Sequence, residues 1–287
     1  FPDLTCEGTF QADSLIYMQV PFTGVQGQVK VRDRVLHCEN VTGAVYQGRV
    51  NGRVDIDLKD MNSPLYSGDY QAKSIEVNEF VSRFAGLKEV LFGGCDLGGS
   101  FSARGLDPEI IRNSLSLDAD AGVKQGKLVT TGNVYQALNK LSAQAGQTLN
   151  SEQALRDLAT HIKVENGRVG VDNLTVRLGQ VGEVTVGGYY AFNGDVNYSG
   201  SILLTKDQTD RLFASGVMAE LGKLLGSKRP ERLAIPLSVG GTRTDPKVKL
   251  DLGSVAQELQ QSVVKEQGKK LEGEAKTKLN DLIKKWK

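Results

Sequence analysis

The chain has 287 residues, with 35 Lys or Arg against 34 Asp or Glu and a formal net charge of +1. Because the two signs are closely mixed, no basic stripe is available to follow phosphates, and nucleic acid is not an expected partner. Hydrophobic residues make up 39% and charged residues 24%, which excludes a disordered chain. No apolar run approaches the roughly 20 residues that a membrane-spanning helix needs.

Glycine is frequent, at 33 residues, whereas aromatic residues make up only 6%. This composition predicts an aliphatic core and a chain that turns often, as in a β-rich protein. The length fits one large β unit or two units of roughly 100–150 residues. The chain begins at Phe1 without an initiator Met or a signal-like stretch, which is typical of a processed chain or an excised fragment.

The first clear strands alternate apolar and polar residues. Residues 25–31 follow this period of two, and residues 49–58 follow it strictly, with aliphatic residues or Gly at even positions and charged or amide residues at odd positions. Such a strand has one apolar and one polar face. Val50, Val54 and Ile56 share the apolar face, which must lie against something apolar.

A further strand is predicted over 70–77, and a helical turn over 78–84 places Phe80 and Phe84 on one face. The paired glycines that follow lack the context of a phosphate loop, so we predict tight turns and bulges between strands.

Two helical stretches interrupt the strands. Asp107 and Pro108 are suited to the N-cap and the first position of a short helix over 107–115. Two more short helices lying on the sheet are predicted over 134–158, on either side of a break at 146–151.

Strands return over 162–205, where Asn166-Gly167 is a hairpin signal. A helix is predicted over 208–225, before two last strands at 233–239 and 247–252. The stretches 22–77 and 162–205 share a rhythm that suggests a repeated β unit. We therefore predict a mainly β protein with helices (β-rich α+β): a long, curved antiparallel meander or groove of repeated units, with short helices packed on it.

The C-terminal segment, 254–287, has apolar residues at steps of three and four between many Lys and Glu. This pattern predicts an amphipathic helix. Gly268 and Gly273 each weaken it by about 1 kcal/mol, so two helices joined by a flexible point are an alternative. The Lys-rich end with Trp286 suits an anionic membrane surface, but closing the end of the sheet or binding a partner helix is equally compatible.

No metal or cofactor is expected. Cys6, Cys38 and Cys95 show no CxxC spacing, and His37 and His161 lie outside any metal-ligand pattern. Cys6 and Cys38 both lie in strand-like stretches, either as a disulfide of an oxidising compartment or as small buried hydrophobes.

The sequence also offers no set of catalytic residues. The carboxylate pairs Asp55/Asp57 and Asp118/Asp120 are spaced at i, i+2 with no His near them in the sequence, as on a solvated strand face. His161 has no nucleophile motif beside it. We therefore predict that the protein is not an enzyme.

The second half of the chain resembles a known family. The stretches that carry the resemblance include GLDPEIIRNSL at 105–115, IKVENGRV at 162–169, IPLSVGGT at 235–242 and DPKV at 245–248. They are similar to the C-terminal region of AsmA-like proteins, the AsmA and TamB type of Gram-negative envelope protein. The resemblance covers residues 105–252.

The resemblance implies a periplasmic protein whose full-length form is anchored to the inner membrane by an N-terminal helix absent here. It implies a role in outer-membrane biogenesis, in which phospholipid is bound or conducted along a hydrophobic β-groove between the two membranes. It divides the chain into a β-repeat region (1–105), an AsmA-like C-terminal β domain with short helices (106–253) and the amphipathic C-terminal helical segment (254–287). No catalytic motif or cofactor comes with the family.

Val50, Val54 and Ile56 are then the candidate lipid-facing residues, because acyl tails need an apolar surface while the headgroup stays wet. A closed core that uses the same face has the same period of two. The alternative function is a non-enzymatic envelope assembly or scaffold module, which binds other proteins through its sheet edge or C-terminal helix.

Overall fold

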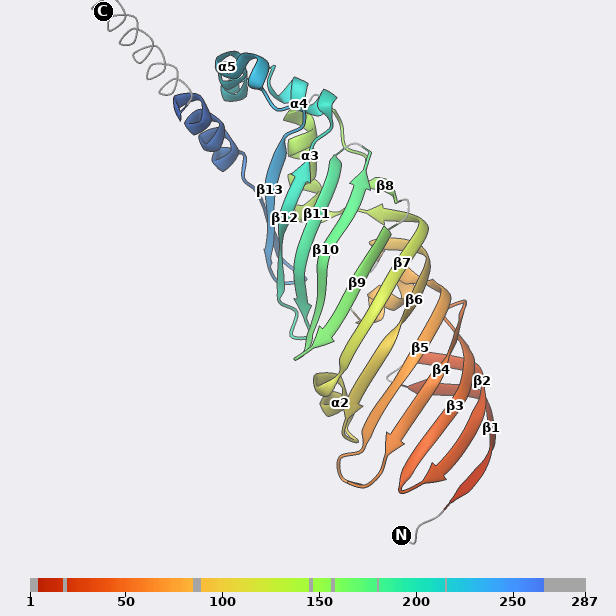
Figure 1. Cartoon of the computed structure of the whole chain (residues 1–287). Helices are drawn as coiled ribbons and strands as arrows, with labels where there is room; N and C mark the ends of the chain where they lie inside the picture. Colours follow the sequence, from red (N-terminus) through yellow and green to blue (C-terminus); the bar gives the residue numbers. More distant parts are fainter. Residues whose placement is uncertain are drawn as a thin grey trace, which may run out of the picture.

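The computed structural model is dominated by one open antiparallel sheet of 14 strands, which Figure 1 shows as an elongated, twisted ribbon. It describes residues 5–17, 20–84, 89–144, 147–155, 158–179, 181–214 and 216–265. The predicted β-rich class with an antiparallel meander and a minority of helices is confirmed. None of the helices within these ranges is both long and apolar enough to cross a membrane.

The strands follow one another across the sheet almost in chain order. The first seven are β1 Cys6–Tyr17, β2 Val20–Arg32, β3 Val35–Val45, β4 Gly48–Asp57, β5 Leu65–Glu76, β6 Leu91–Arg104 and β7 Ser116–Val129. The others are β8 Glu152–Leu155, β9 Leu158–Glu165, β10 Arg168–Leu178, β11 Gly182–Ala191, β12 Val196–Leu203, β13 Ala234–Gly241 and β14 Pro246–Leu250. The exception is β8, which pairs with β7 beside β9. The sheet passes from β6 to β7 without a break.

The helices lie in the connections between strands. They are α1 Val77–Phe84, α2 Pro108–Ser114, α3 Gly132–Gln144, α4 Lys206–Leu212, α5 Gly216–Leu225, the 3-10 turn η1 Gly226–Lys228 and a helix over 252–265. The prediction over 107–115 is confirmed, because Asp107 accepts hydrogen bonds from the backbone N–H groups of Glu109 and Ile110 at the start of α2.

The prediction of a second short helix before residue 158 is wrong. The chain there forms β8 and the start of β9, and Gln153 and Leu155 alternate with exposed neighbours in β8. Pairing with β7 therefore makes this segment a strand, because four residues are too few to form a stable helix by themselves. The helix predicted over 208–225 is divided into α4 and α5. The segment 254–287 is helical up to residue 265, and the rest of that prediction lies outside the described residues.

The hairpin predicted at Asn166-Gly167 is confirmed. Asn166 and Gly167 have φ angles of 51° and 69°, as a two-residue turn between antiparallel strands requires. The turn joins β9 to β10 and places Glu165 opposite Arg168.

Three clusters of buried side chains form the core. The largest joins α3, α4 and α5 to β11–β13, with Leu141, Ile202 and Ile235 among its most buried members. Two smaller clusters lie around α1, on β5–β7 and the neighbouring strands. The helices thus cover parts of one sheet face. The other parts of that face are not covered by the described helices.

The end of the β1–β2 hairpin, residues 14–17 and 20–23, leaves the line of the sheet, with Thr23 still paired to Ala44 of β3. The regular pairing is interrupted between Ala12–Val25 and Ser14–Thr23, and Gly24 has a φ of 58° at that point. In Figure 1 the two strand ends then run behind β3 and β4. Val20 is only 6% exposed and belongs to one cluster with Ala72 of β5, so this hairpin end packs on the sheet face.

Candidate functional site: an apolar sheet face and the polar face behind it

The register of the strands brings apolar residues into one continuous row across the sheet. This apolar row consists of directly paired residues on β1–β7 and β9–β12: Gly8, Val29, Cys38, Val54, Gly68, Phe101, Leu117, Val164, Val169, Tyr190 and Val196. Every side chain in it points to the same face, because paired residues share a face of a sheet. Most of these side chains are half-buried.

A second row of the same face runs beside the first, two residues along each shared strand except β3, where a bulge between Cys38 and Val41 makes the step three. It consists of Val41, Gly52, Tyr70, Gly99, Ala119, Ile162, Val171, Gly188, Tyr198, Val239 and Val248, on β3–β7 and β9–β14. The apolar row itself includes no member of the three core clusters. Val164 and Ala119 are buried, and Val239 and Val248 pack against the largest cluster. The other members of the two rows form a mostly half-buried apolar band outside the clusters.

The three predicted lipid-facing residues lie on this face but differ in their surroundings. Val54 belongs to the apolar row. Ile56 lies two residues further along β4 on the same face, opposite Leu36 of β3 and Tyr66 of β5. Val50 packs against the cluster that contains Val20 of the hairpin end. Val50 thus joins a small closed core, whereas Val54 and Ile56 are half-buried outside it.

Aromatic rings of this face lie over glycines of neighbouring strands. A Cβ atom added to Gly27 would lie 2.8 Å from the Phe10 ring, and one added to Gly68 would lie 3.1 Å from the Phe101 ring. Tyr70 is directly opposite both Gly52 and Gly99. Because glycine leaves a gap that an adjacent ring can fill, the sequence can place large rings here without crowding.

Tyr70 carries a polar group into this apolar surface. Its hydroxyl is buried and has no hydrogen-bond partner in the described part of the chain. Burial is the main cause that raises the pKa of Tyr70 to about 12, with a further contribution from Cys95. Its ring centroid lies 6.3 Å from that of Phe101, with the rings tilted by 55°. Burial likewise raises the pKa of Tyr198 to about 12.

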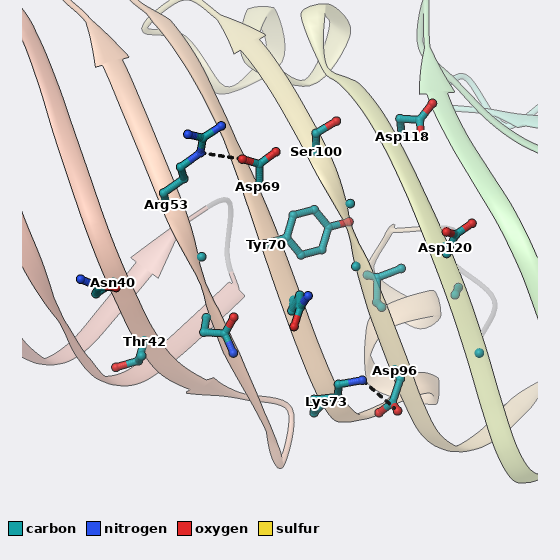
Figure 2. Close-up of a pocket in the computed structure, with 18 of the residues that line it drawn as sticks. Asn40, Thr42, Arg53, Asp69, Tyr70, Lys73, Asp96, Ser100, Asp118 and Asp120 are labelled. Carbon is teal, nitrogen blue, oxygen red and sulfur yellow. Dashed lines mark hydrogen bonds and ion pairs between the residues drawn. The ribbon is translucent and has the colours of Figure 1, made fainter.

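The hairpin end lies near this tyrosine. Val20 of the hairpin end shares a cluster with Ala72, two residues along β5 from Tyr70. Burial raises the pKa of Tyr17, and Tyr66 of β5 adds to the rise. Figure 2 shows the pale red strand ends of the hairpin behind β4, on the side away from the viewer. Ile16 of the same hairpin end is 71% exposed, so the hairpin end has one packed and one open side.

The opposite face is polar and hollowed at its centre. The hollow has a volume of about 1320 Å³ and is drawn in Figure 2. Two ion pairs cross it: Arg53 Nε lies 2.6 Å from Asp69 Oδ2, and Lys73 Nζ lies 3.4 Å from Asp96 Oδ2. A hydrogen bond from the Ser74 backbone N–H, together with Lys73, lowers the pKa of Asp96.

The expectation that no His accompanies the carboxylate pairs is wrong. His37 Nδ1 lies 2.7 Å from Asp55 Oδ1. His161 Nδ1 lies 2.9 Å from Asp120 Oδ1, and His161 Nε2 lies 3.4 Å from Asp118 Oδ1. Each contact joins neighbouring strands, which the sequence separation conceals. The imidazole and carboxylate groups are all substantially solvent-exposed on the polar face.

The cysteines are all free. Cys6 lies on β1 and Cys38 on β3, with β2 between them. The structure therefore does not show the disulfide alternative. The other alternative, small buried hydrophobes, does not hold either, because Cys6 is exposed and Cys38 is only half-buried. Cys95 is buried, which raises the pKa of its thiol.

No family model matches the chain, and neither a curated protein nor a solved structure does so.

Proposed function

We propose that this chain binds phospholipid through the apolar face of its sheet and, in line with its resemblance to AsmA-like proteins, serves outer-membrane biogenesis in the periplasm. The apolar row is the observation that supports this proposal. An ordinary closed core would bury such a row under helices or a second sheet. Here most of its side chains are half-buried, with Val164 as the buried exception, and all of them lie outside the core clusters.

The dimensions of the row suit acyl chains. Neighbouring strands are about 4.8 Å apart, so a row from β1 to β12 extends for about 50 Å, against about 30 Å for the hydrocarbon core of a bilayer. Each methylene that moves from water to such a surface gains about 0.8 kcal/mol. Acyl chains can therefore lie along the face while the headgroup remains in water at its margin, and the face acts as a groove between the membranes.

The remaining parts of the chain have supporting roles in this function. The full-length protein is held at the inner membrane by a preceding helix, and the C-terminal helical segment contacts a membrane surface or an envelope protein. The β repeats provide the length of the path. None of these steps requires a catalytic residue, a cofactor or nucleic acid.

A non-enzymatic assembly module is the second candidate, and the free edge of β1 favours it. β1 is 12 residues long, almost entirely exposed and contains neither Lys nor Pro, which are devices that protect edge strands from pairing. At the other edge, β14 has 5 residues, including Lys247 and Lys249. A partner strand would therefore add at β1.

A photo-reactive side chain can test the lipid proposal in cells. We expect a substitution at Ile56 to crosslink to phospholipid and one at Asp55 not to do so, because consecutive residues of a strand point to opposite faces. Lipid extracted from the natively purified protein and identified by mass spectrometry should match the adduct. Adducts to protein alone at Ile56 would favour the assembly module.

A charge on the row distinguishes an open surface from a closed core. We expect Val54→Asp to fold, because the new carboxylate remains partly hydrated, and to reduce the lipid adduct at Ile56. Asp55→Asn is the matched control and should leave the adduct intact. Unfolding of Val54→Asp would show a closed core, since an unpaired buried charge costs several kcal/mol against a total stability of roughly 5–15 kcal/mol.

A further inference from the structure

Among the residues that the structure describes, the Tyr70 hydroxyl is a donor without an acceptor. It is buried among the described residues with no hydrogen-bond partner, although buried hydroxyls are almost always paired. A Phe side chain would fill the same space and avoid the desolvation of the hydroxyl. The packing of the ring therefore does not account for a tyrosine at this position.

The surroundings of Tyr70 belong to the apolar face. Gly52 and Gly99 flank it on the adjacent strands, and Phe101 of the apolar row lies against its ring. The cluster that contains Val20 lies beyond it on β5, at Ala72. A ligand on the apolar row would thus lie beside Tyr70, whose buried hydroxyl is a polar group within an otherwise apolar neighbourhood.

We propose that Tyr70 determines which lipid the apolar face binds, by donating a hydrogen bond to the ester carbonyl oxygen of an acyl chain. This inference rests on the proposed function. An ester carbonyl is the acceptor that a diacyl lipid carries next to its tails, whereas the charged phosphate stays in water. A diether lipid has the same headgroup and tails but no carbonyl, so Tyr70 favours diester over diether lipids.

Access to the hydroxyl involves the hairpin end. Val20 of the hairpin end packs with Ala72, two residues along β5 from Tyr70, and the outer side of the hairpin end is exposed at Ile16. A lipid that lies between the sheet and the hairpin end therefore needs only this hairpin end to shift, while the paired parts of β1 and β2 remain in place.

Equilibrium binding of two matched lipids tests the assignment. The probes are a short-chain diester phosphatidylcholine and its diether analogue of equal chain length, each below its critical micelle concentration. One neutral hydrogen bond corresponds to about a two- to tenfold ratio of dissociation constants. We expect this preference for the diester in the wild-type chain and its loss in Tyr70→Phe, with diether affinity unchanged. Tyr198→Phe, on the same face, should keep the preference.

The outcomes separate this inference from the function on which it rests. If the wild-type chain binds neither lipid, the proposed function fails. If it binds both and Tyr70→Phe retains the diester preference, only the role of Tyr70 is overturned. Thermal unfolding supplies the second readout: Tyr70→Phe should melt at the same or a higher temperature, and a lower melting temperature would reveal an internal partner of the hydroxyl and overturn the assignment.

Discussion

Asp120 and His161 are directly opposite each other on β7 and β9, and 2.9 Å separate Asp120 Oδ1 from His161 Nδ1. Arg53 and Asp69 form the same kind of direct pair on β4 and β5. The polar face is therefore organised by charged cross-strand pairs, a recurrent element of antiparallel sheets. This arrangement leaves the other face to apolar residues, and the His–Asp contacts belong to the same set of cross-strand pairs.

The pKa of His161 provides a direct test of this pairing. The hydrogen bond to Asp120 is the largest influence, and it raises the pKa above the usual 6.5, with Asp118 adding to the effect. The stabilising contribution of the charged imidazole is therefore fully present below pH 6.5 and is lost as the pH rises through the higher folded-state value. In an NMR titration, Asp120→Asn should lower the midpoint of His161 more than Asp118→Asn does. Equal midpoints in the wild type and Asp120→Asn would contradict the pairing.

Local patterns were sufficient to predict several elements of the fold. Residues 49–58 alternate strictly and form β4, and Asp107 and Pro108 carry the start of α2. The Asn166-Gly167 turn follows from the φ angles that these residues tolerate. Each of these signals is complete within about ten residues, so no knowledge of tertiary pairing was needed.

Other features depend on contacts between distant residues. The segment around Leu155 is a strand because β7 supplies its hydrogen-bond partners, and no pattern of four residues reveals that. His161 meets Asp120 across 41 positions. The apolar row can likewise be recognised only from the complete strand register. The sequence places Val54 on an apolar face, but it does not show whether Val54 lies inside or outside a core cluster.

The neighbouring glycines Gly98 and Gly99 of β6 are expected to differ sharply in their tolerance of a Cβ atom. A Cβ atom added to Gly99 would lie 2.0 Å from the Asp118 carbonyl oxygen, whereas at Gly98 the nearest atom, the Tyr70 carbonyl oxygen, would be 3.5 Å away. Gly99→Ala should therefore cost about 1–3 kcal/mol of unfolding free energy through overpacking, while Gly98→Ala should be neutral or slightly stabilising. Urea denaturation measures both, and equal effects would show that β6 and β7 do not approach so closely.

A buried threonine anchors the connection between α4 and β13. The Thr209 side chain is 0% exposed, and its Oγ1 accepts a hydrogen bond of 3.0 Å from the Leu233 backbone N–H. Thr209→Val keeps the shape but leaves this N–H unpaired, which should cost about 1–3 kcal/mol. The exposed Thr175, which hydrogen-bonds Thr185, is the control, and Thr175→Val should change the urea midpoint much less. A similar loss for both variants would argue against the Leu233 contact.

The packing of the hairpin end can be tested by placing a charge on either of its sides. Val20 is 6% exposed and shares a cluster with Ala72, whereas Ile16 is 71% exposed. In Val20→Asp the carboxylate would have to be buried without a partner, so we expect the hairpin end to lift from the sheet instead. Hydrogen exchange should then become faster over residues 14–17 and 20–23 and remain unchanged over 25–31, where pairing with β3 persists. Ile16→Asp already places its charge in water and should leave exchange as in the wild type. If both variants exchange alike, the hairpin end does not pack on β5, and the route by which lipid reaches Tyr70 would have to be open from the start.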